Sequence, residues 1–158
     1  MLTHIDENGN AQMVNISEKA ITQRLAIASG KISMRNETLA LIKSQNHKKG
    51  DVLTVAKIAA IQAAKNTSTL IPMCHFIALT SVEIEFKINE KDSIIECIAT
   101  TKCSGQTGVE MEALTAVSFG LLTIYDMCKA MDRGMEIRTV SLIRKNGGKS
   151  GDWYETSS

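Results

Sequence analysis

The chain has 158 residues, 44% of them hydrophobic, which is enough to build one real core. Eighteen basic and seventeen acidic side chains leave a net charge of +1, and one Trp, two Tyr and three Phe are the only aromatic residues. This composition excludes a general nucleic-acid binder, which would be more basic. Any anion that the protein holds is therefore expected to be small and locally bound.

One domain over residues 1–158 is expected, because no repeat, low-complexity tract or linker interrupts the chain. The segments of about 1–15 and 151–158 are polar and lack periodicity, which predicts flexible ends. The start of the chain has no basic region followed by an apolar run, and no uncharged apolar stretch long enough to span a membrane occurs. We therefore expect a soluble, cytoplasmic protein with neither a membrane nor nucleic acid among its partners.

The first half of the chain predicts one strand followed by two helices. Apolar residues alternate loosely in 22–34, which favours a strand, with a helix as the alternative. Helical spacing follows in 36–45. After a basic turn at 47–50, Asp51 can cap a second helix over about 52–66.

The second half predicts a β-hairpin, a long helix and a final strand. Strict alternation in 82–88 indicates a half-buried strand, and a second strand from 94 to about 103 completes the hairpin. The segment 107–110, Thr-Gly-Val-Glu, has the spacing of a capping box, so the long helix should begin there and run to about Met131. A last strand over about 135–144 precedes a glycine-rich tail.

This order of elements favours an α+β fold with helices packed on one face of a largely antiparallel sheet. The other face of such a sheet can stay in water or take part in assembly. Four cysteines form no C-x-x-C pair, so we expect reduced and mostly buried thiols.

Asp126 and Lys129 are three residues apart on the long helix, so they occupy neighbouring positions of one face. Such a pair can act as acid and base, or it can be an ordinary helix salt bridge. The flanking residues are apolar, which predicts partial burial of the pair. Burial is how a carboxylate or an amine acquires a pKa suited to proton transfer.

Glu110 and Glu112 stand at the start of the same helix, where carboxylates usually serve as caps or as partners of the helix dipole. Glu112 is freer to bind an amine or guanidine-like group of a ligand. Fourteen residues separate Glu112 from Asp126, which corresponds to roughly 21 Å along a helix. A reaction that uses both residues therefore predicts a site shared between subunits.

Cys74 and His75 stand at the entrance to a strand. No second His or Cys lies at ligand spacing, so a metal site is not expected. His75 can transfer a proton or contact a substrate, or it can be a structural histidine with a satisfied ring.

The tail from Lys145 to Asp152 resembles the end of a phosphate loop, but a Walker motif needs glycine at position 143, where this chain has Ile143. This excludes a P-loop ATPase. A glycine-rich loop with Lys145 and Lys149 can still close on a phosphate, as can the turn at Lys48-Lys49-Gly50, although both can also be solvated loops.

Several segments occur in a characteristic order: Lys49-Gly50-Asp51, 71–75 (Ile-Pro-Met-Cys-His), 102–114, 123–130 (Thr-Ile-Tyr-Asp-Met-Cys-Lys-Ala) and 147–152 (Gly-Gly-Lys-Ser-Gly-Asp). Together they resemble the cyclic pyranopterin monophosphate synthases of molybdenum cofactor biosynthesis. The resemblance extends over nearly the whole chain, from about His4 to Asp152.

The resemblance implies a ferredoxin-like α+β subunit in a homohexamer, a trimer of dimers, with active sites between subunits. It implies a lyase that rearranges 3',8-cyclo-7,8-dihydroguanosine 5'-triphosphate to cyclic pyranopterin monophosphate and releases pyrophosphate. It also implies a functional link to the radical SAM enzyme that cyclises GTP upstream. Neither a metal nor a redox cofactor is expected.

The resemblance also implies roles for single residues. Asp126 and Lys129 match the catalytic aspartate and lysine of the family. The residues that match its substrate-binding segments, or belong to the same acidic cluster, are Met73, Cys74, His75, Glu110, Met111 and Glu112. Lysines that match those assigned to the reaction or to the triphosphate are Lys49 and Lys145, with Lys149 as a further candidate.

Three positions depart from the family pattern: Phe76 replaces a usual proline, Asn15 a usual aspartate and Asn146 a usual serine. A non-catalytic nucleotide-binding subunit and a purely structural oligomer are the alternatives to an enzyme. A buried pair of Asp126 and Lys129 would argue against both, since simple binding does not need one.

Overall fold

The computed structural model describes residues 2–45 and 50–156. In chain order its elements are β1 (Thr22–Ser33), α1 (Asn36–Ser44), α2 (Val52–Lys65), α3 (Thr67–Leu70), β2 (Ser81–Asn89), β3 (Ile94–Gly105), α4 (Glu110–Cys128), β4 (Glu136–Asn146) and β5 (Trp153–Tyr154). The strand predicted at 22–34 is therefore confirmed, and the alternative helix there is wrong. Oδ1 of Asp51 accepts from the backbone N–H groups of Leu53 and Thr54, which confirms Asp51 as the cap of α2.

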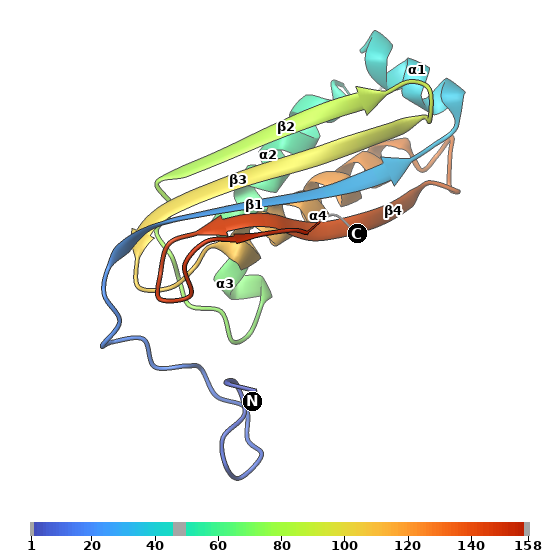
Figure 1. Ribbon diagram of the computed structural model, residues 1–158. Coiled ribbons are helices and arrows are strands. Elements are labelled where there is room, and N and C mark those ends of the chain that lie inside the picture. The colour runs from blue at the N-terminus through green and yellow to red at the C-terminus, as the bar shows by residue number, and fades with distance from the viewer. Residues whose placement is uncertain (1, 46–49, 157–158) are drawn as a thin grey trace.

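The strands form one antiparallel sheet in the order β2-β3-β1-β4-β5, with β1 at its centre. The chain passes from β1 through α2 to β2 and β3, and then through α4 to β4. This β-α-β-β-α-β order gives the α+β, ferredoxin-like fold that we predicted. Figure 1 shows the sheet with α2 and α4 behind it, and α1 and α3 at opposite ends.

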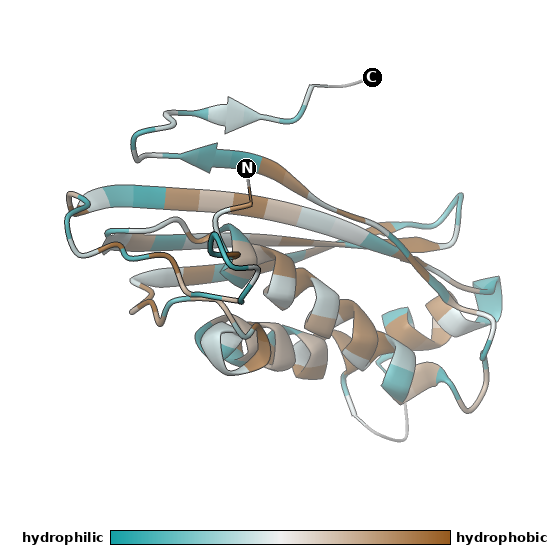
Figure 2. Ribbon diagram, turned by 90° about the horizontal axis from the view of Figure 1, so that it is seen from below, coloured by the Kyte–Doolittle hydropathy of each residue, from teal (hydrophilic) through white to brown (hydrophobic). Residues whose placement is uncertain are grey.

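The core lies between the sheet and the pair of helices α2 and α4, which also contact each other. On β3 every second residue from Ile95 to Cys103 is buried, as the period of a strand requires. Apolar residues cover much of both helices, which lie together on one side of the sheet (Figure 2). By length and composition α4 could cross a membrane, but most of it is buried in this core, as expected for the central helix of such a layer.

The close approach of α4 to the sheet depends on Gly30 in β1. A Cβ atom at this position would lie 2.8 Å from side-chain atoms of Val117 and Val140 and 2.9 Å from Leu121. On the other side of α4, a Cβ at Gly120 would lie 3.4 Å from Ala60 in α2. Small residues therefore set the spacing of the helix against both neighbours.

Replacing Gly30 by alanine should lower the free energy of unfolding by about 1–3 kcal/mol, because the added methyl must push apart buried β-branched side chains. Urea unfolding of Gly30→Ala measures this loss. Gly134→Ala is the control, since a Cβ there meets only an Asp132 oxygen at 3.8 Å. Equal stability of the two variants would contradict the close packing at Gly30.

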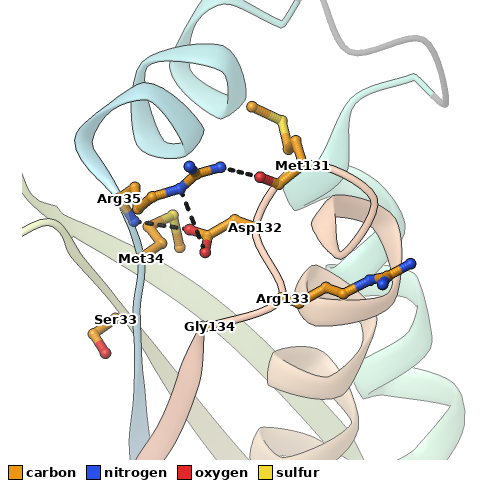
Figure 3. A pocket seen from close by; sticks show the side chains of 7 residues that line it. All are labelled: Ser33, Met34, Arg35, Met131, Asp132, Arg133 and Gly134. Carbon is orange, nitrogen blue, oxygen red and sulfur yellow. Dashed lines mark hydrogen bonds and ion pairs between the residues drawn. The ribbon is translucent and has the colours of Figure 1, made fainter.

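Asp132, in the turn between α4 and β4, joins that turn to the start of α1 (Figure 3). Its Oδ2 accepts from the Arg35 N–H at 2.8 Å and from the Thr38 hydroxyl at 3.0 Å, and the Arg35 guanidinium lies 3.6 Å from Oδ1. Burial would raise the pKa of Asp132, but these hydrogen bonds and the Arg35 charge lower it below the ordinary value. No side chain of α1 itself caps the helix, so Asp132 takes over part of that role.

The predicted capping box at Thr107 is wrong. The helix α4 begins at Glu110, and its N-cap, Val109, makes no side-chain cap hydrogen bond. The Glu110 carboxylate pairs with Lys145, and this contact is not visible in the local sequence.

Two short elements were also not predicted. The helix α3 is a single turn, and β5 has only two residues, so neither is long enough to show a period. The pairing of Trp153 with Lys145 and of Tyr154 with Arg144 places part of the expected flexible tail in the sheet. The guanidinium of Arg144 lies 5.0 Å from the centre of the Tyr154 ring, which adds a cation–π contact.

Candidate active site

A cavity of about 1120 Å³ lies where β1 begins and where β3 and β4 end. The segment before β1, the loop from β3 to α4 and the glycine-rich loop after β4 form its walls. Its charged lining residues are Glu18, Lys19, Arg24, Glu110, Lys145 and Lys149. Four cations against two carboxylates make this cavity suited to a multiply charged anion.

Lys145 and Glu110 form an ion pair inside this cavity, with 2.6 Å between Nζ and Oε1. The lysine comes from the end of β4 and the glutamate from the first residue of α4. Both side chains are about three-quarters buried, so water screens this pair less than a surface pair. The two residues that the sequence assigned to one substrate site therefore do meet.

Arg24 is held in the cavity by the last residue of β3 and by the absence of a side chain at Gly148. Its Nε donates to the Gly105 carbonyl at 2.9 Å. A Cβ at Gly148, which has φ +80°, would lie 2.2 Å from Arg24 Nη1, so only glycine leaves room for the guanidinium. Gly148 thus leaves space beside the loop for the Arg24 guanidinium of β1.

The sequence reasoning missed Lys19 and Arg24. Neither belongs to the segments that carry the family resemblance, and Arg24 is one charged residue among apolar ones in a strand. The sheet brings them to the cavity because β1 begins beside the ends of β3 and β4. The sequence does hold one signal for them, because Lys19 and Arg24 stand just before and just after the start of the predicted strand.

Glu112 lies at the same end of α4 and is only 3% exposed. Burial raises its pKa to about 7, and the negative charge of Glu110 adds to this effect. Its Oε2 and the Thr22 hydroxyl are buried without a hydrogen-bond partner among the described residues. Thr22 lines the cavity and Glu112 does not, so the unsatisfied Thr22 hydroxyl is the one of the two that a ligand in the cavity could reach.

Cys74 and Cys103 lie near these carboxylates. Burial raises the pKa of the Cys74 thiol, and the charges of Glu112 and Glu110 raise it further. Burial also raises the pKa of Cys103, which Arg24 lowers and the two glutamates raise. Both thiols therefore stay protonated at neutral pH.

His75 is tied to the segment before β1, because its Nε2 lies 2.6 Å from the Val14 carbonyl oxygen and donates to it. Met73 is half-buried in the loop between α3 and β2, and Met111 is 37% exposed on α4. Phe76 is 77% exposed and lines a separate hollow of about 460 Å³ beside Ile61 and Leu79, apart from the charged cavity.

Asn15 and Asn146, the other two departures from the family pattern, both accept hydrogen bonds. Asn15 lines the charged cavity, and its Oδ1 accepts from the Ser17 N–H at 2.9 Å. The Oδ1 of Asn146 accepts from Arg144 Nε at 2.6 Å. Each amide oxygen does what an aspartate or serine oxygen could do at the same place.

Asp126 and Lys129 lie at the other end of α4, with 2.7 Å between Oδ1 and Nζ. Their side chains are 65% and 52% exposed, so the predicted partial burial is wrong for this chain. The apolar neighbours Ile124 and Met127 face the core, and the helix turns the charged pair outward. The helix is continuous, so roughly 21 Å along its axis separates Asp126 from Glu112. Lys49 lies outside the described residues.

Fold and cavity together define an α+β domain of ferredoxin-like topology that presents a cation-rich cavity at one end of its sheet. The profile of the MoaC family matches residues 13–148. The chain therefore belongs to the MoaC family, and this membership gives it a role in molybdenum cofactor biosynthesis.

Replacing Glu112 by glutamine should change how stability depends on pH. The unfolded carboxyl ionises near pH 4.5 and the folded one near 7, so the folded chain binds more protons between these values. Wild-type stability should therefore fall as the pH rises through this window, by on the order of 3 kcal/mol, and the glutamine variant should not show this fall. Urea midpoints at pH 5 and pH 8 measure it.

Glu85→Gln, on the exposed side of β2, is the matched control and should keep the wild-type dependence on pH. A wild-type pH profile that Glu112→Gln leaves unaltered would refute the raised pKa of Glu112.

Proposed function

We propose that this protein is a cyclic pyranopterin monophosphate synthase. It rearranges 3',8-cyclo-7,8-dihydroguanosine 5'-triphosphate and releases pyrophosphate. The observation that carries the proposal is the gathering of Lys19, Arg24, Lys145 and Lys149 around one cavity in a chain of the MoaC family. A triphosphate carries several negative charges, which four cations can offset.

The cations of the cavity hold the phosphates and stabilise the charge that develops as pyrophosphate leaves. Lys145 is already positioned by Glu110, and Arg24 by Gly105, so little reorganisation is needed when the anion arrives. Lys49, which precedes α2 in the sequence, and Lys149 complete the set of phosphate ligands in this proposal. Metal and redox cofactors have no step in it.

Opening and reclosing a purine-derived ring requires several proton transfers. Asp126 and Lys129 act as the catalytic acid–base pair in the proposal. Glu112 has a pKa near neutral pH, so it can hold or release a proton beside the substrate. The substrate is lined by Met73, Cys74 and His75, from the loop that leads into β2, and by Met111, from the first turn of α4.

One chain cannot bring both ends of α4 to a single substrate, because roughly 21 Å separates them. The proposed active site therefore lies between subunits of a homohexamer built as a trimer of dimers. An exposed apolar stripe supports this assembly: Phe119 is 38% and Leu122 is 51% exposed, and both share the helix face of Asp126. A second subunit on this face would also bury the Asp126–Lys129 pair.

In this proposal the protein is a single domain and works in the cytoplasm. Its substrate would come from the radical SAM enzyme that cyclises GTP. The intermediate is small and nucleotide-derived, which agrees with a cavity at the end of a sheet and with a balanced overall charge.

Asp126→Ala and Lys129→Ala should each lower turnover of the cyclic dihydroguanosine triphosphate by at least about a hundredfold, since each removes a proton-transfer group. Pyrophosphate release and pterin formation measure turnover. The control is Glu90→Ala, which removes a partner of Lys43 in another exposed ion pair, and it should leave turnover unchanged. Full activity in both helix variants would refute the catalytic role assigned to Asp126 and Lys129.

A mixture of two inactive variants tests whether the site is shared. Glu112→Gln and Asp126→Ala should each be nearly inactive alone. Mixed and reassembled, half of the dimers would contain one chain of each kind, and one of their two sites would be intact. Activity should therefore return to about a quarter of wild type. No recovery, although mass spectrometry shows mixed oligomers, would place both residues in the site of a single chain.

A further inference from the structure

We propose that Gln106 is a positioning residue that fastens the segment 14–20, one wall of the charged cavity, and thereby sets the place of Lys19. The inference rests on the proposed function insofar as the bound anion is the triphosphate of the substrate. Gln106 itself does not touch the reacting atoms in this proposal.

The segment 14–20 has little structure of its own. It lies between the bridge that pairs Ile5 with Ala11 and the start of β1, and it belongs to no helix or strand. Inside it, the Lys19 N–H donates to the Ile16 carbonyl at 3.0 Å, and the N–H and hydroxyl of Ser17 donate to Asn15 Oδ1 at 2.9 and 2.7 Å. These bonds shape the turn but do not join it to the rest of the molecule. Residues of this segment line the cavity: Asn15, Glu18, Lys19 and Ala20. Contacts with other segments therefore fix the position of this wall.

Gln106 supplies two of those contacts with one atom. Its Nε2 donates to the Ser17 carbonyl at 3.2 Å and to the Lys19 carbonyl at 2.9 Å. A side-chain amide nitrogen carries two N–H groups, so it can serve both carbonyls at once. His75 bonds to the Val14 carbonyl at the other end of the segment. Gln106 bonds to the end that carries Lys19.

The loop that carries Gln106 is itself a wall of the cavity, since Gln106, Thr107 and Gly108 line it. The carbonyl oxygen of Gly105, the residue before Gln106, accepts a hydrogen bond from Arg24. The last residue of β3 and the first residue of the loop therefore hold two of the four cavity cations, Arg24 through its guanidinium and Lys19 through its backbone. A shift of this loop would move both cations together.

The test compares Gln106→Ala with Gln62→Ala, a glutamine on the exposed side of α2. Hydrogen exchange by mass spectrometry follows peptides that cover 14–20, and calorimetry measures the affinity for inorganic tripolyphosphate. Gln106→Ala should make amide hydrogen exchange in 14–20 about tenfold faster, because both hydrogen bonds to this wall are lost. It should also weaken tripolyphosphate binding about tenfold. The control should behave as wild type.

A double-mutant cycle with Lys19 tests the route of the effect. If Gln106 acts through Lys19, Gln106→Ala should not weaken tripolyphosphate further in a Lys19→Ala background. An additive loss would overturn the positioning role, and so would unchanged exchange in 14–20. If Gln106→Ala fails to fold, Gln106→Met removes the donor at similar size without adding a charge and must give the same losses.

With the cyclic substrate, Gln106→Ala should raise KM about tenfold and leave kcat within about twofold, as expected when binding is lost uniformly. A fall in kcat at constant KM would overturn the proposal. Tripolyphosphate binding and exchange do not require turnover. A wild-type protein that binds tripolyphosphate in this way but forms no pterin would refute the proposed reaction and leave the role of Gln106 intact.

Discussion

The close contact of α4 with the sheet at Gly30 is the constraint on which the rest of the structure depends. Because no side chain separates β1 from Val117 and Leu121, the helix lies directly on the central strand and its inner face is buried. The small residues Gly120 and Ala60 also let α2 pack closely against α4. Only the two ends of α4 and its outer face remain available for polar side chains. Both groups of predicted functional residues lie in those places.

At the amino-terminal end of α4, two effects oppose each other on Glu112. The helix dipole favours a negative charge in the first turn, whereas burial disfavours it. Burial prevails, because the pKa rises to about 7. Glu110 is in the same turn but forms an ion pair with Lys145, which offsets its negative charge. Two glutamates in one helical turn thus have different environments, and one stays available for a proton while the other orients a cation.

The long elements could be predicted because their apolar periods are strong, as in β2, β3 and α4. The ends of elements and the site could not be predicted as well, because they depend on contacts between distant segments. Glu110 pairs with Lys145 across the chain, so the local capping box did not form. Lys19 and Arg24 reach the cavity only through the order of the strands. The helix start pointed to Glu112 and the glycine-rich tail pointed to Lys145, and the family resemblance then connected both residues with one substrate.

The exposure of Asp126 and Lys129 bears on how catalysis and assembly are related. An exposed pair is screened by water, so its two charges interact only weakly with each other. The apolar side chains of Phe119 and Leu122 stand on the same helix face and are also exposed. One covering surface would remove both anomalies, since it would bury the apolar side chains and desolvate the pair in the same step. Under the proposed shared site, subunit association is therefore part of the chemistry, and an isolated chain would hold the triphosphate without being able to rearrange it.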